Sequence, residues 1–357
     1  MSGMLNCKLG DVIKFGNGKA RPSSEGATPI YGGNGILGYS ADNNYENETI
    51  VIGRVGAYCG ATYYEDQPIW VSDNALAAKP KEKNNAKYIF YFLKYLDLNQ
   101  HAQGSSHPLV TQTLLNSIDV EIVENTDEQK AIAAVLSSLD DKIDLLHRQN
   151  KTLEAMAASL FRQWFVEEAQ ADWEIGSLGE VVEIFDGQRI PLSKMERDKK
   201  KVGILYPYYG AAQIMDYIND YIFDGEYILL GEDGTVRTDE GYPVLQYATG
   251  KFWVNNHTHV LQAKAPYSNF FLWNYLSRTN IDEIVTGAVQ PKINQGNLKS
   301  LAFPRYPKDL VVEFGGITEP ILASIQHNKK QIAGLENLRD TLLPKLMSGE
   351  VRVTQNG

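Results

Sequence analysis

The sequence contains only two cysteines, Cys7 and Cys59, among its 357 residues. Two cysteines cannot form the disulfide framework that is typical of small secreted domains. No apolar run reaches the ~20 residues that a membrane-spanning helix needs. The N-terminus also lacks a basic segment followed by an apolar one, so we expect no secretory signal. These features predict a reduced, cytoplasmic protein without a membrane partner.

Motifs that would carry catalysis are also missing. The sequence has no phosphate-binding P-loop, no G-x-S-x-G nucleophile turn, no H-E-x-x-H zinc motif and no Asn-Pro-Pro element of an amino-methyltransferase. Gly33–Gly38 fits G-x-G-x-x-G, but turn residues follow it where a dinucleotide site needs a helix. His257 and His259 are expected on one face of a strand, where two ligands are too few for zinc. We therefore predict no catalytic residue, no cofactor and no metal, and expect these histidines to pack or form hydrogen bonds near a binding surface.

The charge balance is acidic. Lys and Arg number 34 against 44 Asp and Glu, a formal net charge of −10. Non-specific coating of nucleic acid depends on neutralising phosphates with basic residues, so this balance argues against it. The acidic residues are spread along the whole chain. A protein of this kind would bind DNA only through a local basic face, or together with a partner that supplies positive charge.

The most informative feature present is a long internal repeat. Residues 9–22 align with residues 178–191 without a gap, and further matches follow in the same order along both halves. The matched pairs include Leu9 with Leu178, Gly18 with Gly187, Tyr31 with Tyr209, Gly53 with Gly231, Trp70 with Trp253, Gly104 with Gly287, Pro108 with Pro291, and Gln112 with Gln295. The spacing of the pairs grows slightly along the chain, as small loop insertions would cause. The sequence therefore predicts two homologous domains rather than a short solenoid repeat.

Each repeat has the same composition pattern. A part rich in Tyr, Val, Ile and turn residues comes first, and it predicts strands such as 49–52 and 227–230. A long helical pattern follows, and the first helix opens near Thr126, the expected N-cap, with acidic residues in its first turn. The predicted fold class is α+β, with β-rich domains at 1–125 and 171–308 and long helices at 126–170 and 309–357.

The two long helices both show apolar residues at alternating spacings of about three and four, which is typical of a coiled-coil seam. The predicted pairing residues are Leu139, Ile143, Leu146, Asn150, Leu153 and Leu160 in the first helix, and Ile325, Asn328, Ile332, Leu335 and Leu342 in the second. One asparagine in each seam would fix the register of the pair. The alternative is that each helix packs only on its own domain. A helix of this length would extend roughly 57 Å, which exceeds one turn of duplex DNA.

Polar loops at matching positions are candidates for binding. Gln, Asn, His and Arg side chains suit the edges of bases, and Lys and Arg neutralise phosphates. The candidate DNA-binding residues are Lys19, Arg21, Arg54, His107, Gln112, Arg189, Arg237, Lys251, Gln290, Lys292 and Gln295. The alternative is that these loops are internal turns and that the basic residues are ordinary surface charges. The residue that aligns with Arg54 is Glu232, so this contact would not be shared by the two repeats.

The whole chain resembles the specificity subunit of type I restriction-modification systems. The resemblance lies in the order domain, helix, domain, helix, and in the segments 9–11, 104–112, 128–133, 160–165, 173–180, 287–295 and 342–350. It implies two target recognition domains related by a pseudo-twofold axis and two conserved helices paired as an antiparallel coiled coil. Each recognition domain would bind one half of a bipartite DNA target.

The resemblance also implies partners that carry the chemistry. Two methyltransferase subunits would dock on this chain, bind S-adenosylmethionine and methylate adenine, and a restriction subunit would translocate DNA with ATP, in defence against phage. This chain itself would be non-catalytic. Two alternatives stay open: a duplicated adaptor that binds only protein, and the specificity chain of a fused restriction-methylation enzyme.

Overall fold

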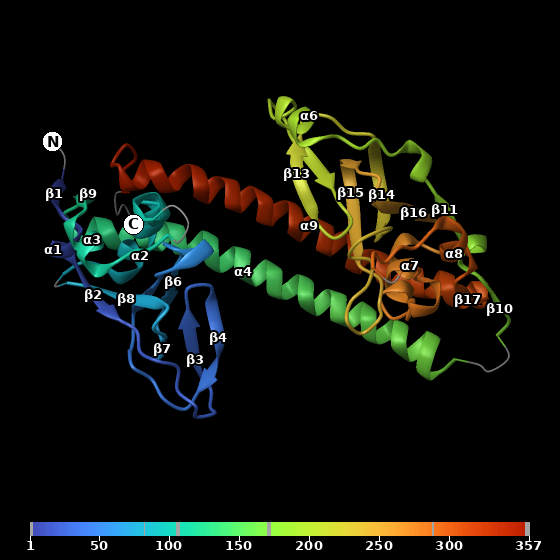
Figure 1. The fold of residues 1–357 in the computed structure, drawn as a ribbon, viewed down its shortest axis with the longest axis horizontal. Coiled ribbons are helices and arrows are strands. Elements are labelled where there is room, and N and C mark those ends of the chain that lie inside the picture. Colours follow the sequence, from blue (N-terminus) through green and yellow to red (C-terminus); the bar gives the residue numbers. More distant parts are fainter. Residues whose placement is uncertain (1–2, 82, 105–107, 170–172, 288, 354–357) are drawn as a thin grey trace. The chain divides into compact units, whose positions relative to one another are not determined.

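The computed structural model describes residues 3–81, 83–104, 108–169, 173–287 and 289–353 (Figure 1). The chain divides into two compact units. Unit 1 comprises Met1–His147 and Lys329–Gly357, and unit 2 comprises Arg148–Asn328. Each long helix contributes one part to each unit, and the two units are described one at a time.

Unit 1 contains a four-stranded antiparallel sheet in the order β2 (Ile13–Asn17), β8 (Ala75–Pro80), β5 (Thr49–Gly53) and β6 (Thr62–Glu65). A three-stranded sheet has the order β4 (Gly35–Ser40), β3 (Thr28–Gly32) and β7 (Trp70–Val71), and β1 (Met4–Lys8) pairs with β9 (Asp119–Val123). The short helices are α1 (Leu9–Val12), η1 (Gly56–Tyr58), α2 (Ala86–Tyr95), η2 (Leu98–His101) and α3 (Gln112–Ser117).

Unit 2 contains a six-stranded sheet in the order β11 (Val182–Ile184), β16 (Thr258–Ala263), β14 (Phe223–Gly231), β15 (Leu245–Val254), β12 (Tyr206–Tyr209) and β13 (Ile214–Ile218). A separate pair joins β10 (Ile175–Ser177) and β17 (Ala302–Pro304). The short helices are α5 (Leu178–Val181), η4 (Asp186–Gln188), α6 (Lys194–Lys199), α7 (Asn269–Leu276), η5 (Asp282–Ile284) and α8 (Gln295–Ser300).

The central strand of each unit is buried on both faces. In β5, Ile50 and Ile52 face the main core of unit 1, and Val51 faces a second cluster around Tyr31. The same alternation occurs in β14, where Ile228 and Leu230 face one core and Leu229 faces another. Side chains alternate between the faces of a strand, so a strand covered on both faces shows a continuous apolar run. This explains why 49–52 and 227–230 were recognisable as strands.

Equivalent backbone hydrogen bonds confirm the internal repeat. The Leu9 amide donates to the Ile118 carbonyl at 2.8 Å, and the Leu178 amide donates to the Leu301 carbonyl at 2.8 Å. In unit 1, β3 pairs in parallel with Trp70–Val71 of β7. In unit 2, β12 pairs in parallel with the equivalent residues Trp253 and Val254 of β15. Helix α6 lies where the spacing between the matched residues increases, so it accounts for an insertion in the second repeat.

The long helices are α4 (Thr126–Arg162), which continues into a π-helical turn at Gln163–Glu167, and α9 (Lys308–Met347). In unit 1 the beginning of α4 shares a core with the end of α9, through Leu136 and Leu346. In unit 2 the end of α4 shares a core with the beginning of α9, through Phe161 and Phe314. The two helices therefore run antiparallel to one another.

The predicted seam residues lie as follows. In unit 1, Ile143, Leu146 and Ile332 form a buried cluster, and Leu335 packs against it. In unit 2, the Asn328 side chain donates to Oδ1 of Asn150 at 2.9 Å. Ile325 is buried, and Leu139, Leu153, Leu160 and Leu342 are half-buried. Near the end of α4, Phe161 is buried in the core of unit 2, as is Phe165 in the π-helical turn, and the predicted Leu160 is half-buried against the same core.

Among the described residues, the structure contains no helix long and apolar enough to cross a membrane.

Candidate functional site

In each unit, loops that are far apart in the sequence are joined by backbone hydrogen bonds. In unit 1 the Arg54 amide donates to the Asn74 carbonyl at 3.0 Å, and the Arg54 carbonyl accepts from the Val110 amide at 3.0 Å. The Gly56 amide also donates to the Pro108 carbonyl at 3.2 Å. These bonds place the loop after β5 between the loop before β8 and the loop before α3.

Unit 2 makes the same bonds at the equivalent positions. The Glu232 amide donates to the His257 carbonyl at 2.9 Å, and its carbonyl accepts from the Ile293 amide at 2.8 Å. The Gly234 amide donates to the Pro291 carbonyl at 3.1 Å. The two repeats therefore share one loop framework, and we take the loops of this framework as the candidate site in each unit.

In each repeat, two backbone hydrogen bonds close the base of the loop before the last short helix, and we call this closed base the pinch. Gln103 and Leu109 exchange two backbone hydrogen bonds, and Thr286 and Lys292 do the same at 2.8 and 2.7 Å. Just inside each pinch the chain needs a left-handed conformation, with φ of +90° at Gly104 and +86° at Gly287. Glycine adopts this conformation at little cost, which explains why the repeat retains it.

The repeated glutamines connect the helix after this loop to the end of the first strand of the sheet in unit 1 and to the turn after that strand in unit 2. The Gln112 side chain donates to Oδ1 of Asn17 at 2.7 Å, and the Gln295 side chain donates to Oδ2 of Asp186 at 2.7 Å. Asn17 and Asp186 also occupy equivalent positions in the aligned repeats. In this structure both glutamines hold the framework together, a role that the sequence did not reveal.

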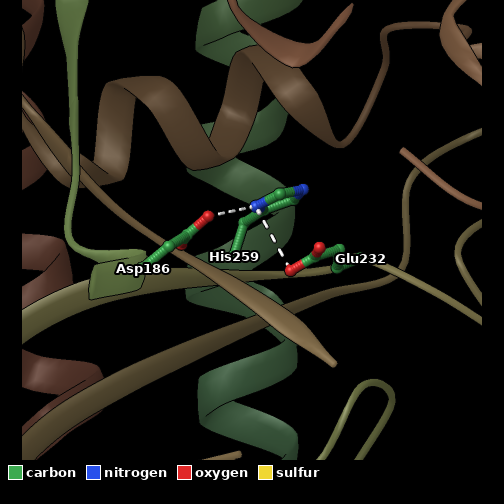
Figure 2. Close-up of side chains that lie close together, drawn as sticks. All are labelled: Asp186, Glu232 and His259. Carbon is green, nitrogen blue, oxygen red and sulfur yellow. Dashed lines mark hydrogen bonds and ion pairs between the residues drawn. The ribbon is translucent and has the colours of Figure 1, made fainter. Parts of the chain in front are cut away.

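In unit 2 this junction contains a buried group of charges (Figure 2). Nδ1 of His259 lies 2.6 Å from Oδ2 of Asp186 and 3.9 Å from Oε2 of Glu232. The side chain of His259 is 0% exposed and that of Asp186 is 2% exposed. Arg189 donates to Oε2 of Glu232 at 2.6 Å, and also to the carbonyl of Thr258. We call Asp186, Arg189, Glu232 and His259 the buried charge network.

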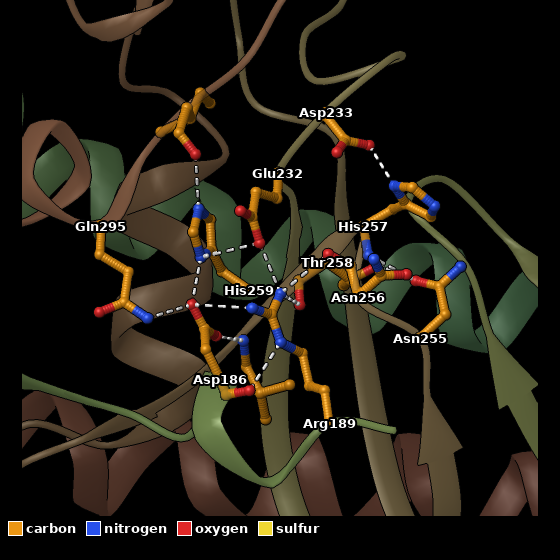
Figure 3. A network of polar contacts seen from close by, with 12 residues as sticks. Asp186, Arg189, Glu232, Asp233, Asn255, Asn256, His257, Thr258, His259 and Gln295 are labelled. Carbon is orange, nitrogen blue, oxygen red and sulfur yellow. Dashed lines mark hydrogen bonds and ion pairs between the residues drawn. The ribbon is translucent and has the colours of Figure 1, made fainter. Parts of the chain in front are cut away.

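The side chains of the network also form hydrogen bonds with the neighbouring backbone (Figure 3). The second ring nitrogen of His259, Nε2, lies 2.8 Å from the carbonyl oxygen of Ile293. Both ring nitrogens of His259 therefore face acceptor oxygens. Burial raises the pKa of Asp186, but hydrogen bonds from His259 and the Val260 amide and the positive charges of His259 and Arg189 outweigh it, so the pKa lies below its usual value.

The carboxylates and the imidazole of the network are ligand types that could hold a metal ion, and their ligand atoms lie within 4.8 Å of one another. The chain supplies its own cation at this place. The Arg189 guanidinium lies 2.6 Å from Glu232 and 3.6 Å from Asp186, and its side chain is only 12% exposed. We therefore assign these carboxylates to Arg189 and His259 rather than to a metal.

The expectation that His257 and His259 share one face of a strand is wrong. His257 lies in the turn before β16, where it is exposed and its Nδ1 lies 2.5 Å from Oδ1 of Asp233. His259 lies within β16 and points into the core. The change occurs because the strand begins only at Thr258. His259 is therefore a functional candidate. From the sequence alone it looked no different from an ordinary packing residue.

Apart from Gln112 and Gln295, which hold the framework loops, the predicted basic and polar residues fall into three groups. Lys19, Arg54 and Gln290 lie on or next to the framework loops, and Arg21 lies on the loop after β2; Lys19, Arg21 and Gln290 are exposed and Arg54 is half-buried. Arg189, Lys292, Arg237 and Lys251 have partners within unit 2: Glu232 for the first two, Asp282 for Arg237, and the ring of Tyr221 for Lys251. His107 lies outside the described residues. The structure therefore brings only part of the predicted set together, and their roles in binding stay predictions.

Comparison with known proteins places this framework in context. Residues 1–155 and 170–309 match the family described as type I restriction modification DNA specificity domain. The MjaIX type I restriction enzyme specificity subunit of Methanocaldococcus jannaschii is 24% identical over 312 residues, covering 77% of this chain and 71% of that one. A putative type I restriction enzyme specificity subunit from Haemophilus influenzae is 32% identical over 163 residues, covering 46% of this chain and 40% of that one.

A solved structure shows the same fold. The S subunit of the type I restriction-modification system from M. genitalium superposes with a TM-score of 0.66 at 19% sequence identity, covering 96% of both chains. The predicted fold class, with two β-rich domains and long helices between and after them, is confirmed.

Proposed function

The chain belongs to the family of type I restriction-modification DNA specificity domains, and from this premise we propose that each of its two repeats recognises one half of a bipartite DNA target. Unit 1 provides one recognition domain and unit 2 provides the other. In this proposal the helices α4 and α9 connect the two recognition domains, and the chain itself performs no catalysis.

One observation carries this proposal: the two loop frameworks have the same backbone hydrogen bonds but different side chains. Arg54 in unit 1 is replaced by Glu232 in unit 2, and Leu109 at the pinch is replaced by Lys292. A shared backbone holds the loops at equivalent places, and different side chains there, by direct contact or by positioning exposed neighbours, allow the two repeats to recognise different bases. An adaptor that bound the same protein twice would gain nothing from this divergence.

The exposed side chains at these loops supply suitable chemistry. In unit 2, Val289 is 99% exposed and Gln290 is exposed beside it, so an apolar group and an amide are offered together. Such groups contact the thymine methyl and the edge of adenine in the major groove. In unit 1, Lys19 and Arg21 are exposed on the loop after β2 and would contact phosphates or guanine.

Partner subunits complete the activity. The net charge of −10 leaves little positive charge to neutralise DNA phosphates over a long target. We therefore propose that two methyltransferase subunits, which bind S-adenosylmethionine, dock on this chain and supply phosphate contacts. A restriction subunit that uses ATP would join the same complex.

Selection from a random duplex pool tests the function. The full chain is incubated with the duplexes with and without its methyltransferase subunit, and bound duplexes are separated by gel shift and sequenced. We expect enrichment of two short, different half-sites at a fixed spacing, strongest when the methyltransferase is present. Enrichment of a single continuous site, or of no sequence with the methyltransferase present, would contradict the proposal and favour the protein-binding adaptor.

A further inference from the structure

The two repeats join their framework loops with different side chains. Unit 1 joins its loops with a neutral pair, Asn17 and Gln112. Unit 2 joins the equivalent loops with Asp186 and Gln295, and adds His259 at the place of Leu76 in unit 1. Unit 1 therefore demonstrates that this framework forms without buried charges.

His259 lies where three loops of unit 2 meet. Its Nδ1 contacts Asp186, which follows β11, and the same nitrogen faces Glu232, which follows β14. Its Nε2 contacts the carbonyl of Ile293, the residue that directly follows the exposed segment 289–292. The Ile293 amide in turn donates to the Glu232 carbonyl, so both polar backbone groups of Ile293 are held.

Buried ionic groups are poor stabilisers, because the loss of hydration offsets most of their attraction. Their side chains are held in one geometry, however, since any displacement leaves a charge or a donor unpaired. In unit 2 that geometry includes the backbone on which Val289, Gln290 and Lys292 are presented. Lys292 is itself directed toward the network, with its Nζ 3.5 Å from Oε1 of Glu232.

We propose that His259, through Asp186 and Glu232, is a positioning residue for DNA recognition by unit 2: it holds segment 289–293 in the conformation that recognises the second half-site. The inference rests on the proposed function of unit 2 and adds to it the residue that determines specificity without touching DNA. It also makes the two half-sites unequal, since the described residues of unit 1 join the same loops through the neutral pair Asn17 and Gln112 and have Leu76 at the position of His259.

The test is the pair of substitutions Asp186→Asn and His259→Leu in one full-length chain. This double variant copies the residues at the equivalent positions of unit 1. It removes the charges of Asp186 and His259 together, so neither is left unpaired, while Arg189 and Glu232 keep one another as partners. Affinities are measured in complex with the methyltransferase, for the selected target and for targets with one half-site scrambled. We expect discrimination of the second half-site to fall about tenfold or more, the cost of about one mismatched base pair. Discrimination of the first half-site stays within twofold.

Hydrogen exchange separates positioning from stability. In the double variant, exchange in 289–293 should rise, while exchange in 108–110 of unit 1 and the melting temperature of the chain stay near wild type. A folded double variant that keeps full discrimination of the second half-site would overturn the inference. So would an equal loss at both half-sites.

A second variant covers the case in which the double variant does not fold. Glu232→Gln preserves size and weakens only the contacts of Glu232 with Arg189, His259 and Lys292. It should produce the same selective loss and the same local rise in exchange, and unchanged exchange in 289–293 would overturn the inference. If the wild-type complex selects no bipartite target, the proposed function fails, and the exchange measurement still decides whether His259 holds the segment.

Discussion

The hydrogen bond between Asn328 and Asn150 allows a sharp test of how α4 and α9 pair in unit 2. Asn150 is 7% exposed, and its Oδ1 accepts from the Asn328 side chain at 2.9 Å. The substitution Asn328→Leu removes the donor and leaves a buried oxygen unpaired, which costs about 1–3 kcal/mol. For a unit of this size each kcal/mol lowers the melting temperature by about 2–4 °C. The variant should therefore melt roughly 2–12 °C lower in the transition of unit 2.

The double variant Asn150→Leu, Asn328→Leu is the matched control. Replacing both partners with apolar groups of similar size is close to neutral or stabilising. We therefore expect the double variant to melt near wild type or above it, although each single variant melts lower. Differential scanning calorimetry, which follows separate transitions, provides the measurement. A double variant that melts as low as the single variants would refute the reasoning, because the loss would then not come from an unpaired amide.

Four further predictions follow from the structure and the proposed function. Leu146→Asp places a charge in the cluster with Ile332, so unit 1 should lose several kcal/mol and methyltransferase assembly on size-exclusion chromatography should fail; normal assembly would contradict the pairing. Because the pKa of Asp186 is lowered, its contribution to stability is complete above its unfolded pKa of about 3.8 and is lost as the pH falls through the folded pKa. The stability of unit 2 in the variant Asp186→Asn should therefore depend less on pH in that window. Gly287→Ala adds a Cβ 2.3 Å from the Gln290 carbonyl oxygen at a φ of +86°, so exchange in 289–293 should rise, and wild-type exchange would show that the loop adapts. Finally, calorimetry of the isolated chain with S-adenosylmethionine should detect no binding, and micromolar affinity would refute the non-catalytic assignment.

Local sequence patterns were sufficient to predict part of this fold. The internal repeat, the two long helices and the loops at Gly104 and Gly287 could all be predicted. Each depends on constraints that act over a few residues: a glycine at positive φ, acidic residues in the first turn of a helix, or apolar residues at helical spacing. The N-cap of the first long helix is Asn125 rather than the expected Thr126, since Oδ1 of Asn125 accepts from the amides of Asp127 and Glu128. The heptad pattern was accurate around Ile143 and Leu146, where the helices pair closely. Toward the end of the helix, Leu160 is half-buried and packs against the core of unit 2 beside the buried Phe161, so its pairing with the second helix stays a prediction.

By itself, then, the sequence determined the duplicated architecture and the resemblance to a family, because repeated local patterns survive divergence of the surrounding residues. The tertiary structure alone decided what the candidate residues do. Arg189 became a buried partner of Glu232 rather than an exposed basic residue, and Gln112 and Gln295 became ties between loops. His259 acquired partners that lie far from it along the chain, at Asp186 and Ile293. No periodicity links such positions, because they meet only when separate strands of a sheet bring their ends together.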